Sequence, residues 1–245
     1  MIIFLYGADT FRSRQHLYRI IEKFKKDRDP SGLNVIRLDT EKAEPSVILN
    51  EILASPFLAD RRLIVLENLL RSKNSDFHLE LLARIEEKRL PDSNVLVISE
   101  SGEKITNKDT KKLFDRLKGE KYAQEFAPLD GAKLVAWITD TTQERGGTIS
   151  AAAVRALAGE SGADLWSLSG ILDQLIAYAD KREITPVDVA EFTEHRAPDN
   201  IFALIDFIVG KQPKQVFTMI QEQYREGKDA FYLLAMLVRQ GRILI

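Results

Sequence analysis

The first half of the chain alternates short apolar runs with longer segments whose apolar residues recur at helical spacing. The apolar runs have the length of buried strands and lie at residues 2–6, 35–38, 63–66, 95–99 and 122–126. The intervening segments, in which Leu17, Ile21 and Phe24 illustrate the helical period, predict helices at 11–26, 46–54, 77–88 and 108–117. Such alternation is typical of a parallel sheet covered by helices. We therefore predict an α/β domain over residues 1–128.

Beyond residue 129 the strands stop, and alanine-rich helical segments follow one another. Their separators are residues 146–147, 159–162 and 181–184. Thr185, Pro186 and Asp188 have the spacing of a capping box at the start of a helix. Near residues 196–200 a second boundary precedes helical patterns at 201–209, 215–225 and 230–245. The expected fold class is α/β plus all-α, with a small helical domain at 129–198 and part of a further helical domain at 199–245.

Residues 54–66 place a bulky apolar pair, Phe57 and Leu58, in a predicted loop. Pro56 disfavours helix at the preceding residue, and the polar triplet at 60–62 indicates a surface position. An apolar pair in a surface loop suggests contact with another molecule. The alternative is a loop anchored by its own hydrophobic side chains.

Three segments of the chain resemble the bacterial DNA polymerase III delta subunit, the clamp-loader delta family. They are Pro56-Phe57-Leu58-Ala59-Asp60-Arg61-Arg62 with the apolar strand that follows, the opening at residues 3–11, and Asp199-Asn200-Ile201-Phe202-Ala203-Leu204. In that family the corresponding segments are Pro-Phe-Phe-Ala-acidic-basic-Arg, the first strand and its turn, and Asn-Ile-Phe-x-Leu. The three segments occur in the same order in this chain as in the family. The resemblance covers essentially all of the chain. It implies an AAA+-like parallel-sheet domain, a helical lid domain and a helical collar domain.

In that family the two hydrophobic residues of this segment enter an apolar pocket on the beta sliding clamp and favour an open ring for loading onto primed DNA. The resemblance therefore implies that Phe57 and Leu58 form a clamp-binding wedge. The rim of the same contact would comprise Ala59, Asp60, Arg61 and Arg62. From the residues alone, Arg61 and Arg62 are equally well explained by pairing within the fold. The implied partners are the beta clamp, the gamma/tau and delta prime subunits, and DNA through the assembled complex of the polymerase holoenzyme.

The turn after the first strand lacks the residues of a phosphate-binding loop. It reads Gly7-Ala8-Asp9-Thr10-Phe11-Arg12-Ser13, with one glycine and no Gly-Lys-Ser/Thr. Asp9 places negative charge where phosphate would lie, but suits a helix cap. Glu67 has the position of a magnesium-organising carboxylate without a second acidic neighbour. We expect no nucleotide, metal or cofactor and no intrinsic catalysis, as the resemblance also implies. The alternatives are a degenerate ATPase using Glu67 and an AAA+-shaped scaffold that binds no clamp.

Composition excludes several further classes of function. The net charge of −2 gives no overall cationic field for nucleic acid, and the absence of cysteine excludes disulfides, thiolate catalysis and cysteine-ligated zinc. His16, His78 and His195 are isolated in the sequence. Acidic residues alternate with a local basic cluster, which predicts a solvated helix face; its members are Lys104, Lys108, Lys111, Lys112, Arg116, Lys118 and Lys121. No basic leader or apolar stretch of spanning length is present, so a cytoplasmic location without a membrane partner is expected.

The final residues stop partway into the expected collar domain, which puts collar assembly in doubt. The chain is then either a fragment or a natural short form. In the second case a set of apolar residues stays exposed or finds a partner, namely Leu233, Leu234, Leu237, Leu244 and Ile245.

Overall fold

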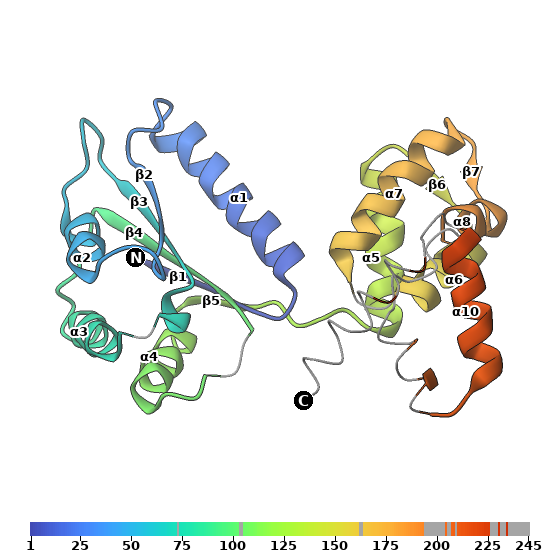
Figure 1. Cartoon of the computed structure of the whole chain (residues 1–245). Helices are drawn as coiled ribbons and strands as arrows, with labels where there is room; N and C mark the ends of the chain where they lie inside the picture. The colour runs from blue at the N-terminus through green and yellow to red at the C-terminus, as the bar shows by residue number, and fades with distance from the viewer. Residues whose placement is uncertain are drawn as a thin grey trace. The chain divides into compact units, whose positions relative to one another are not determined.

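The computed structural model describes residues 1–72, 74–102, 105–161, 164–193, 204, 207–208, 210–225, 230 and 234 (Figure 1). The chain forms two compact units. The first unit comprises Met1–Leu134 with Ala163–Ser167, and the second comprises Val135–Gly162 with Leu168–Ile245. The predicted domain limits at residues 128 and 198 stay predictions. Several features expected from the sequence lie wholly or largely outside the described residues, namely Lys104, His195, the segment at 199–204, the helices at 201–209 and 230–245, and most of the terminal apolar set.

A parallel five-stranded sheet forms the centre of the first unit. Its strands are β1 (Ile2–Gly7), β2 (Val35–Asp39), β3 (Arg62–Glu67), β4 (Asn94–Ser101) and β5 (Tyr122–Glu125), in the spatial order β2-β3-β4-β1-β5. All five predicted strands are confirmed. The central strands are buried on both faces, which explains why their sequences are continuous apolar runs and not alternating patterns. The four residues at 63–66 are all fully buried.

The helices of the first unit cover both faces of this sheet. Helix α1 (Thr10–Arg28) lies on one face, and α2 (Pro45–Leu53), α3 (Ser75–Glu86) and α4 (Lys108–Lys118) lie on the other (Figure 1). The four helices predicted from periodicity are therefore confirmed. Successive strand residues point to opposite faces, so that Phe4 and Leu66 pack with α2, α3 and α4, whereas Leu5 and Val65 pack with α1.

The rest of the described chain is mainly helical. Its helices are α5 (Gly131–Glu144), α6 (Ala151–Ser161), α7 (Leu165–Ala179), α8 (Pro186–Thr193) and α10 (Pro213–Arg225). The expectation that strands stop at residue 129 is wrong in one respect, because β6 (Thr148–Ile149) and β7 (Glu183–Ile184) form a parallel pair. Two-residue strands are too short to produce an apolar run. Gly159 does not end a helix, since α6 continues to Ser161.

At the start of α8, Asp188 reaches back to Thr185 as the capping-box spacing predicts. The backbone N–H and the hydroxyl of Thr185 donate to one carboxylate oxygen of Asp188, at 2.8 and 2.9 Å. Arg182 donates to both oxygens of the same carboxylate, at 2.6 and 2.7 Å. These bonds, with that from Arg182 foremost, hold the pKa of Asp188 well below its usual range. None of the described helices is both long and apolar enough to cross a membrane.

Two leucines on α3 provide a test of the core. Leu81 is fully buried against α4 and the sheet, whereas Leu79 on the same helix is 38% exposed. We expect Leu81→Ala to lower the free energy of unfolding by about 2–5 kcal/mol, because the packed surroundings cannot fill the cavity completely. Leu79→Ala should lower it by less than about 1 kcal/mol. Urea unfolding followed by circular dichroism measures both values, and equal losses would contradict the packing described.

Candidate functional site

The apolar pair and the degenerate phosphate turn lie at opposite edges of the sheet. Strand register places Val35 beside Leu63 and Arg62 beside Asn94, so the amino ends of β2, β3 and β4 share one edge. The loop carrying the apolar pair leads into β3 and therefore lies at this amino edge. The turn at residues 7–10 follows β1 and lies at the carboxyl edge. The two candidate sites are thus separated by the length of the strands.

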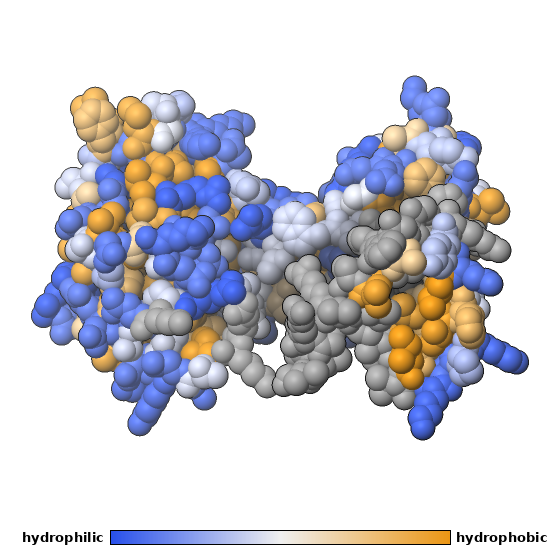
Figure 2. All heavy atoms as spheres, in the orientation of Figure 1, coloured by the Kyte–Doolittle hydropathy of each residue, from blue (hydrophilic) through white to orange (hydrophobic). Residues whose placement is uncertain are grey.

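Phe57 and Leu58 both project into solvent. Phe57 is 57% exposed and Leu58 is 92% exposed, so neither side chain anchors the loop in the core. Leu58 has a φ of 49°, in the left-handed region that side chains other than glycine adopt only at a cost of about 1 kcal/mol or more. Figure 2 shows hydrophobic atoms at the end of the first unit where this loop lies. Exposed apolar side chains on a strained backbone indicate a contact surface.

The buried side chain of Asn34 holds the backbone of Phe57 from both directions. Its Nδ2 donates to the carbonyl oxygen of Phe57 at 2.9 Å, and the N–H of Phe57 donates to its Oδ1 at 2.6 Å. Asn34 is 1% exposed, so its end of both bonds is shielded from competing water. The side-chain amide of Asn34 thus pairs with the backbone of Phe57 as a neighbouring strand would. It fixes the main chain from which the exposed phenyl ring projects.

Asp29, which follows α1, holds Asn34 in turn. Its carboxylate accepts the backbone N–H of Asn34 at 2.7 Å, the Nδ2 of Asn34 at 3.3 Å and the hydroxyl of Ser31 at 2.9 Å. Burial alone would raise the pKa of Asp29, but these donors outweigh it and lower the pKa. The ionised carboxylate therefore accepts hydrogen bonds throughout the neutral range. The orientation of Asn34, and through it that of Phe57, depends on this charge.

A second buried asparagine fixes the start of the loop. The Nδ2 of Asn94 donates to the carbonyl oxygens of Ile52 and Ala54, at 2.8 and 2.9 Å. These are among the last carbonyls of α2 and have no partner within the helix. Neither Asn34 nor Asn94 was predicted from the sequence as a positioning residue. The available signal was a polar residue directly before each of two predicted buried strands, but the sequence does not indicate which loop each contacts.

The expected rim residues differ in their surroundings. Arg62 has a side chain that is 12% exposed, forms an ion pair with Glu51 of α2 and donates weakly to the carbonyl oxygen of Ser55 at 3.5 Å. The side chain of Arg62 is thus paired within the fold. Arg61 is exposed and donates to the carbonyl oxygen of Asp92 at 3.1 Å. Asp60 is exposed and Ala59 is half-buried. A rim role for these residues stays a prediction.

At the carboxyl edge, the turn after β1 uses its hydrogen-bonding groups internally. Asp9 caps α1 by accepting the N–H of Arg12 at 2.9 Å and forms an ion pair with the guanidinium of the same residue. The N–H of Asp9 donates to the carbonyl oxygen of Phe126 at 2.9 Å. Gly7 has a φ of 133°, and a Cβ there would lie 2.3 Å from that same oxygen. The turn is packed against β5 and does not present a cradle of amides to a phosphate.

Glu67, at the end of β3, is paired with two arginines. Its carboxylate accepts from the Nε of Arg37 at 3.1 Å and lies 3.4 Å from a guanidinium nitrogen of Arg14. These contacts favour a structural role over magnesium binding. Within the described residues, no three histidine, aspartate or glutamate side chains are placed to hold a metal ion.

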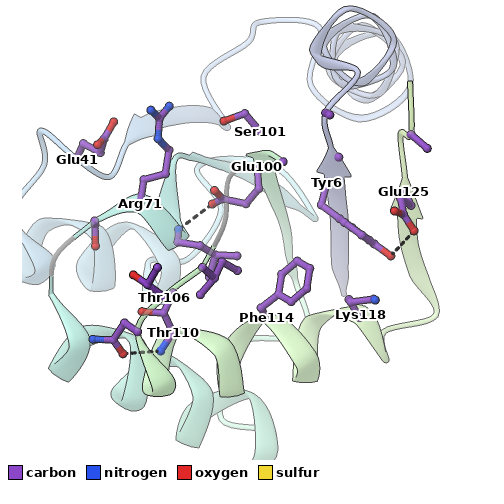
Figure 3. A pocket seen from close by; sticks show the side chains of 18 of the residues that line it. Tyr6, Glu41, Arg71, Glu100, Ser101, Thr106, Thr110, Phe114, Lys118 and Glu125 are labelled. Carbon is purple, nitrogen blue, oxygen red and sulfur yellow. Dashed lines mark hydrogen bonds between the residues drawn. The ribbon is translucent and has the colours of Figure 1, made fainter. Parts of the chain in front are cut away.

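A cavity of about 710 Å³ opens at the carboxyl edge beside α4 (Figure 3). Glu100 is buried in its wall and accepts the N–H of Leu70 at 2.9 Å. Burial raises the pKa of Glu100 to about 8, although that hydrogen bond and Arg71 act in the opposite direction. The group is therefore mostly neutral at pH 7. Two further carboxyl groups, those of Glu41 and Glu125, line the cavity, which disfavours a phosphate ligand.

Three of the five basic residues of α4 are paired or packed locally. Lys112 lies 2.8 Å from Asp109, and Arg116 lies 2.6 Å from Glu120. The ammonium group of Lys118 lies over the ring of Phe114, 5.5 Å from its centre. The interleaved acids predicted from the sequence thus offset this charge, and the helix does not form a continuous cationic surface within the described residues.

Comparison with known proteins connects this architecture to replication. The sequence profile of the family described as DNA polymerase III, delta subunit, matches residues 4–126. The chain is 21% identical to DNA polymerase III subunit delta of Bacillus subtilis over 248 residues, which covers 98% of this chain and 70% of that protein.

Two solved structures show the same fold. The Bacillus subtilis DNA clamp loader delta protein YqeN has a TM-score of 0.60 at 20% identity, covering 98% of this chain and 72% of that one. The Thermotoga maritima RuvB Holliday junction branch migration motor has a TM-score of 0.57 at 12% identity, covering 84% of this chain and 68% of that one. These matches confirm an AAA+-like α/β domain combined with helical segments.

The raised pKa of Glu100 predicts how stability depends on pH. Below pH 4.5 the group is protonated in both folded and unfolded chains, and between pH 4.5 and about 8 only the unfolded chain ionises. Its contribution to stability is therefore lost as the pH rises through this interval. We expect Glu100→Gln to be more stable than the wild type at pH 8 by a few kcal/mol, with the difference shrinking towards pH 4.5. Urea unfolding at several pH values measures this, and parallel stability curves would contradict it.

The contact of Asn34 with Phe57 predicts local protection of the loop. In Asn34→Ala the N–H of Phe57 loses its acceptor, so we expect its hydrogen exchange to accelerate by roughly tenfold or more. Asn107→Ala is a matched control, because Asn107 caps α4 by accepting two backbone N–H groups at 2.8 and 3.2 Å. Amide exchange followed by NMR distinguishes the two variants. Equal acceleration at Phe57 in both would show that Asn34 acts only through global stability.

Proposed function

The chain belongs to the DNA polymerase III delta subunit family, and we propose that it binds the beta sliding clamp through Phe57 and Leu58 and opens the ring or holds it open. The observation that carries this proposal is the almost complete exposure of Leu58 on a loop whose backbone is held by buried asparagines. Loading the clamp onto primed DNA during replication is the expected setting, which would place the protein in the cytoplasm.

The size of the two side chains is sufficient for such a contact. Complete burial of a phenylalanine and a leucine contributes roughly 3–6 kcal/mol before the losses of association are subtracted. Those losses include the ordering of any flexible segment at the interface. Because the backbone of Phe57 is already held by Asn34, less ordering is required when the partner binds. A small contact can then supply a useful affinity.

Ring opening through this contact needs binding energy and no chemistry at the site. A protein that binds the open ring more tightly than the closed ring shifts the equilibrium by that difference in affinity. The internally bonded turn after β1 and the paired Glu67 support a subunit without ATP hydrolysis of its own. We propose that ATP is hydrolysed by neighbouring gamma/tau subunits, that delta prime completes the complex, and that DNA is contacted through the assembled loader.

Clamp binding tests this proposal directly. We expect wild-type protein to bind the beta clamp of its own organism, and the double variant Phe57→Ala, Leu58→Ala to bind at least about tenfold more weakly, which corresponds to about 1.4 kcal/mol. Both side chains are exposed, so the variant should keep the wild-type circular dichroism spectrum and melting temperature. Isothermal titration calorimetry measures the affinities.

Leu79→Ala is the matched control, since it removes a partly exposed leucine from α3. Its affinity should equal that of the wild type. An absence of wild-type binding would favour an AAA+-shaped scaffold with another partner. Stabilisation of the wild type by magnesium and ATP would overturn the assignment of a nucleotide-free subunit.

A further inference from the structure

The loop between α1 and β2 exposes a third large hydrophobic side chain at the amino edge. Leu33 is 60% exposed and directly precedes Asn34, whose side chain is bonded to Phe57. It lies outside the segment that carries the apolar pair, and no motif distinguishes it in the sequence. Figure 2 shows hydrophobic atoms at this end of the first unit, where the α1–β2 and α2–β3 loops lie.

One buried network fixes both loops. The carboxylate of Asp29 accepts the backbone N–H of Asn34 at 2.7 Å, and the carbonyl oxygen of Asp29 accepts the N–H of Gly32 at 2.9 Å. The side chain of Asn34 then bonds the backbone of Phe57 at its N–H and its carbonyl oxygen. The buried side chains of Asp29 and Asn34 therefore connect the backbone around Leu33 to the backbone of Phe57.

The carbonyl oxygen of Asn34 strengthens this connection. It accepts the N–H of Leu63 at 2.8 Å, at the start of β3, so the α1–β2 loop is also joined to the sheet. A rigid base under separate loops presents their side chains in a constant arrangement. Such an arrangement favours binding because little conformational entropy is lost on association.

We propose that Leu33 is a third apolar contact of the clamp-binding surface, held in register with Phe57 and Leu58 by Asp29 and Asn34. This inference rests on the proposed function. Leu33 directly precedes Asn34, whose side chain holds the backbone of Phe57, so the two loops form one continuous surface. Residues that lie close in sequence to the three apolar residues, namely Ser31, Asp60 and Arg61, are polar, which matches an apolar contact with a polar edge.

A contact from a second loop would also determine the orientation of the protein on the ring. Phe57 and Leu58 are adjacent on one loop, so their contact is small and allows the protein to rotate about it. A third anchor on a separate loop removes that freedom without enlarging the interface greatly. Favouring one ring state over another requires a defined orientation, since the differential affinity arises from contacts that only one state allows.

Leu33→Ala tests the third contact. We expect roughly a five- to twentyfold loss of affinity for the beta clamp, measured by titration calorimetry with the full chain. Val187→Ala is the matched control, because Val187 is 75% exposed on α8 of the second unit, and its affinity should equal that of the wild type. Both variants should keep the wild-type melting temperature, because both side chains are mostly exposed.

A combination of variants tests the role of Asn34. In an Asn34→Ala background the loops are no longer held together, so adding Leu33→Ala should reduce affinity less than about twofold. An unchanged five- to twentyfold effect in that background would overturn the positioning role of Asn34. If Asn34→Ala does not fold, the Leu33→Ala and Val187→Ala comparison still decides whether Leu33 is a contact.

The outcomes separate this inference from the proposed function. If the Phe57→Ala, Leu58→Ala variant loses binding and Leu33→Ala binds as the wild type does, the third contact is wrong and the wedge stands. If wild-type protein does not bind the clamp, the proposed function itself fails. A loss with Leu33→Ala that Val187→Ala does not share supports the inference.

Discussion

The exposed apolar surface depends on one buried interaction, the pairing of the Asn34 side chain with the backbone of Phe57. An asparagine that is 1% exposed must satisfy its polar groups internally, and here Phe57 and Asp29 are its partners. The same bonds hold the chain directly before Leu58, whose positive φ would otherwise relax. Removing either partner leaves a buried polar group without a hydrogen bond, so the position of the loop is coupled to the stability of the fold.

The parallel sheet determines where function can lie. In open α/β sheets, ligands usually bind at the carboxyl ends of the strands. In this chain the polar groups that could hold phosphate or magnesium at that edge are engaged internally, since Asp9 is paired with Arg12 and Glu67 is bonded to Arg37. The apolar surface lies at the opposite edge, where the loops entering β2 and β3 meet. The carboxyl edge can therefore lack a phosphate-binding loop while the sheet stays intact. The apolar surface at the amino edge does not depend on that loop.

The sequence predicts the first unit well because burial dominates there. Strands enclosed on both faces must be continuous apolar runs, and their helices must carry an apolar stripe, so the five strands and the helices α1 to α4 were predicted, whereas the short 3-10 helix at Leu69–Arg71 was not. The exposed position of Phe57 and Leu58 followed from the polar residues around them. The contacts of Asn34 and Asn94 could not be predicted, because each joins segments distant in sequence. Pairing of Arg62 within the fold was one of two alternatives, but the sequence did not identify Glu51 as its partner. The raised pKa of Glu100 was missed because its cause is burial in the folded chain, and the β6–β7 pair is too short to leave a pattern.

The residues that position the exposed apolar surface differ from the residues that form it. Asp29, Asn34 and Asn94 are buried and bonded, so their loss affects both folding and the geometry of the loops. Leu58 is almost fully exposed and Phe57 is more than half exposed, so folding gains less from them than from core residues, and their exposure reduces solubility. In the proposed complex these side chains would be removed from water, and the fixed backbone beneath them would limit the entropy lost on binding.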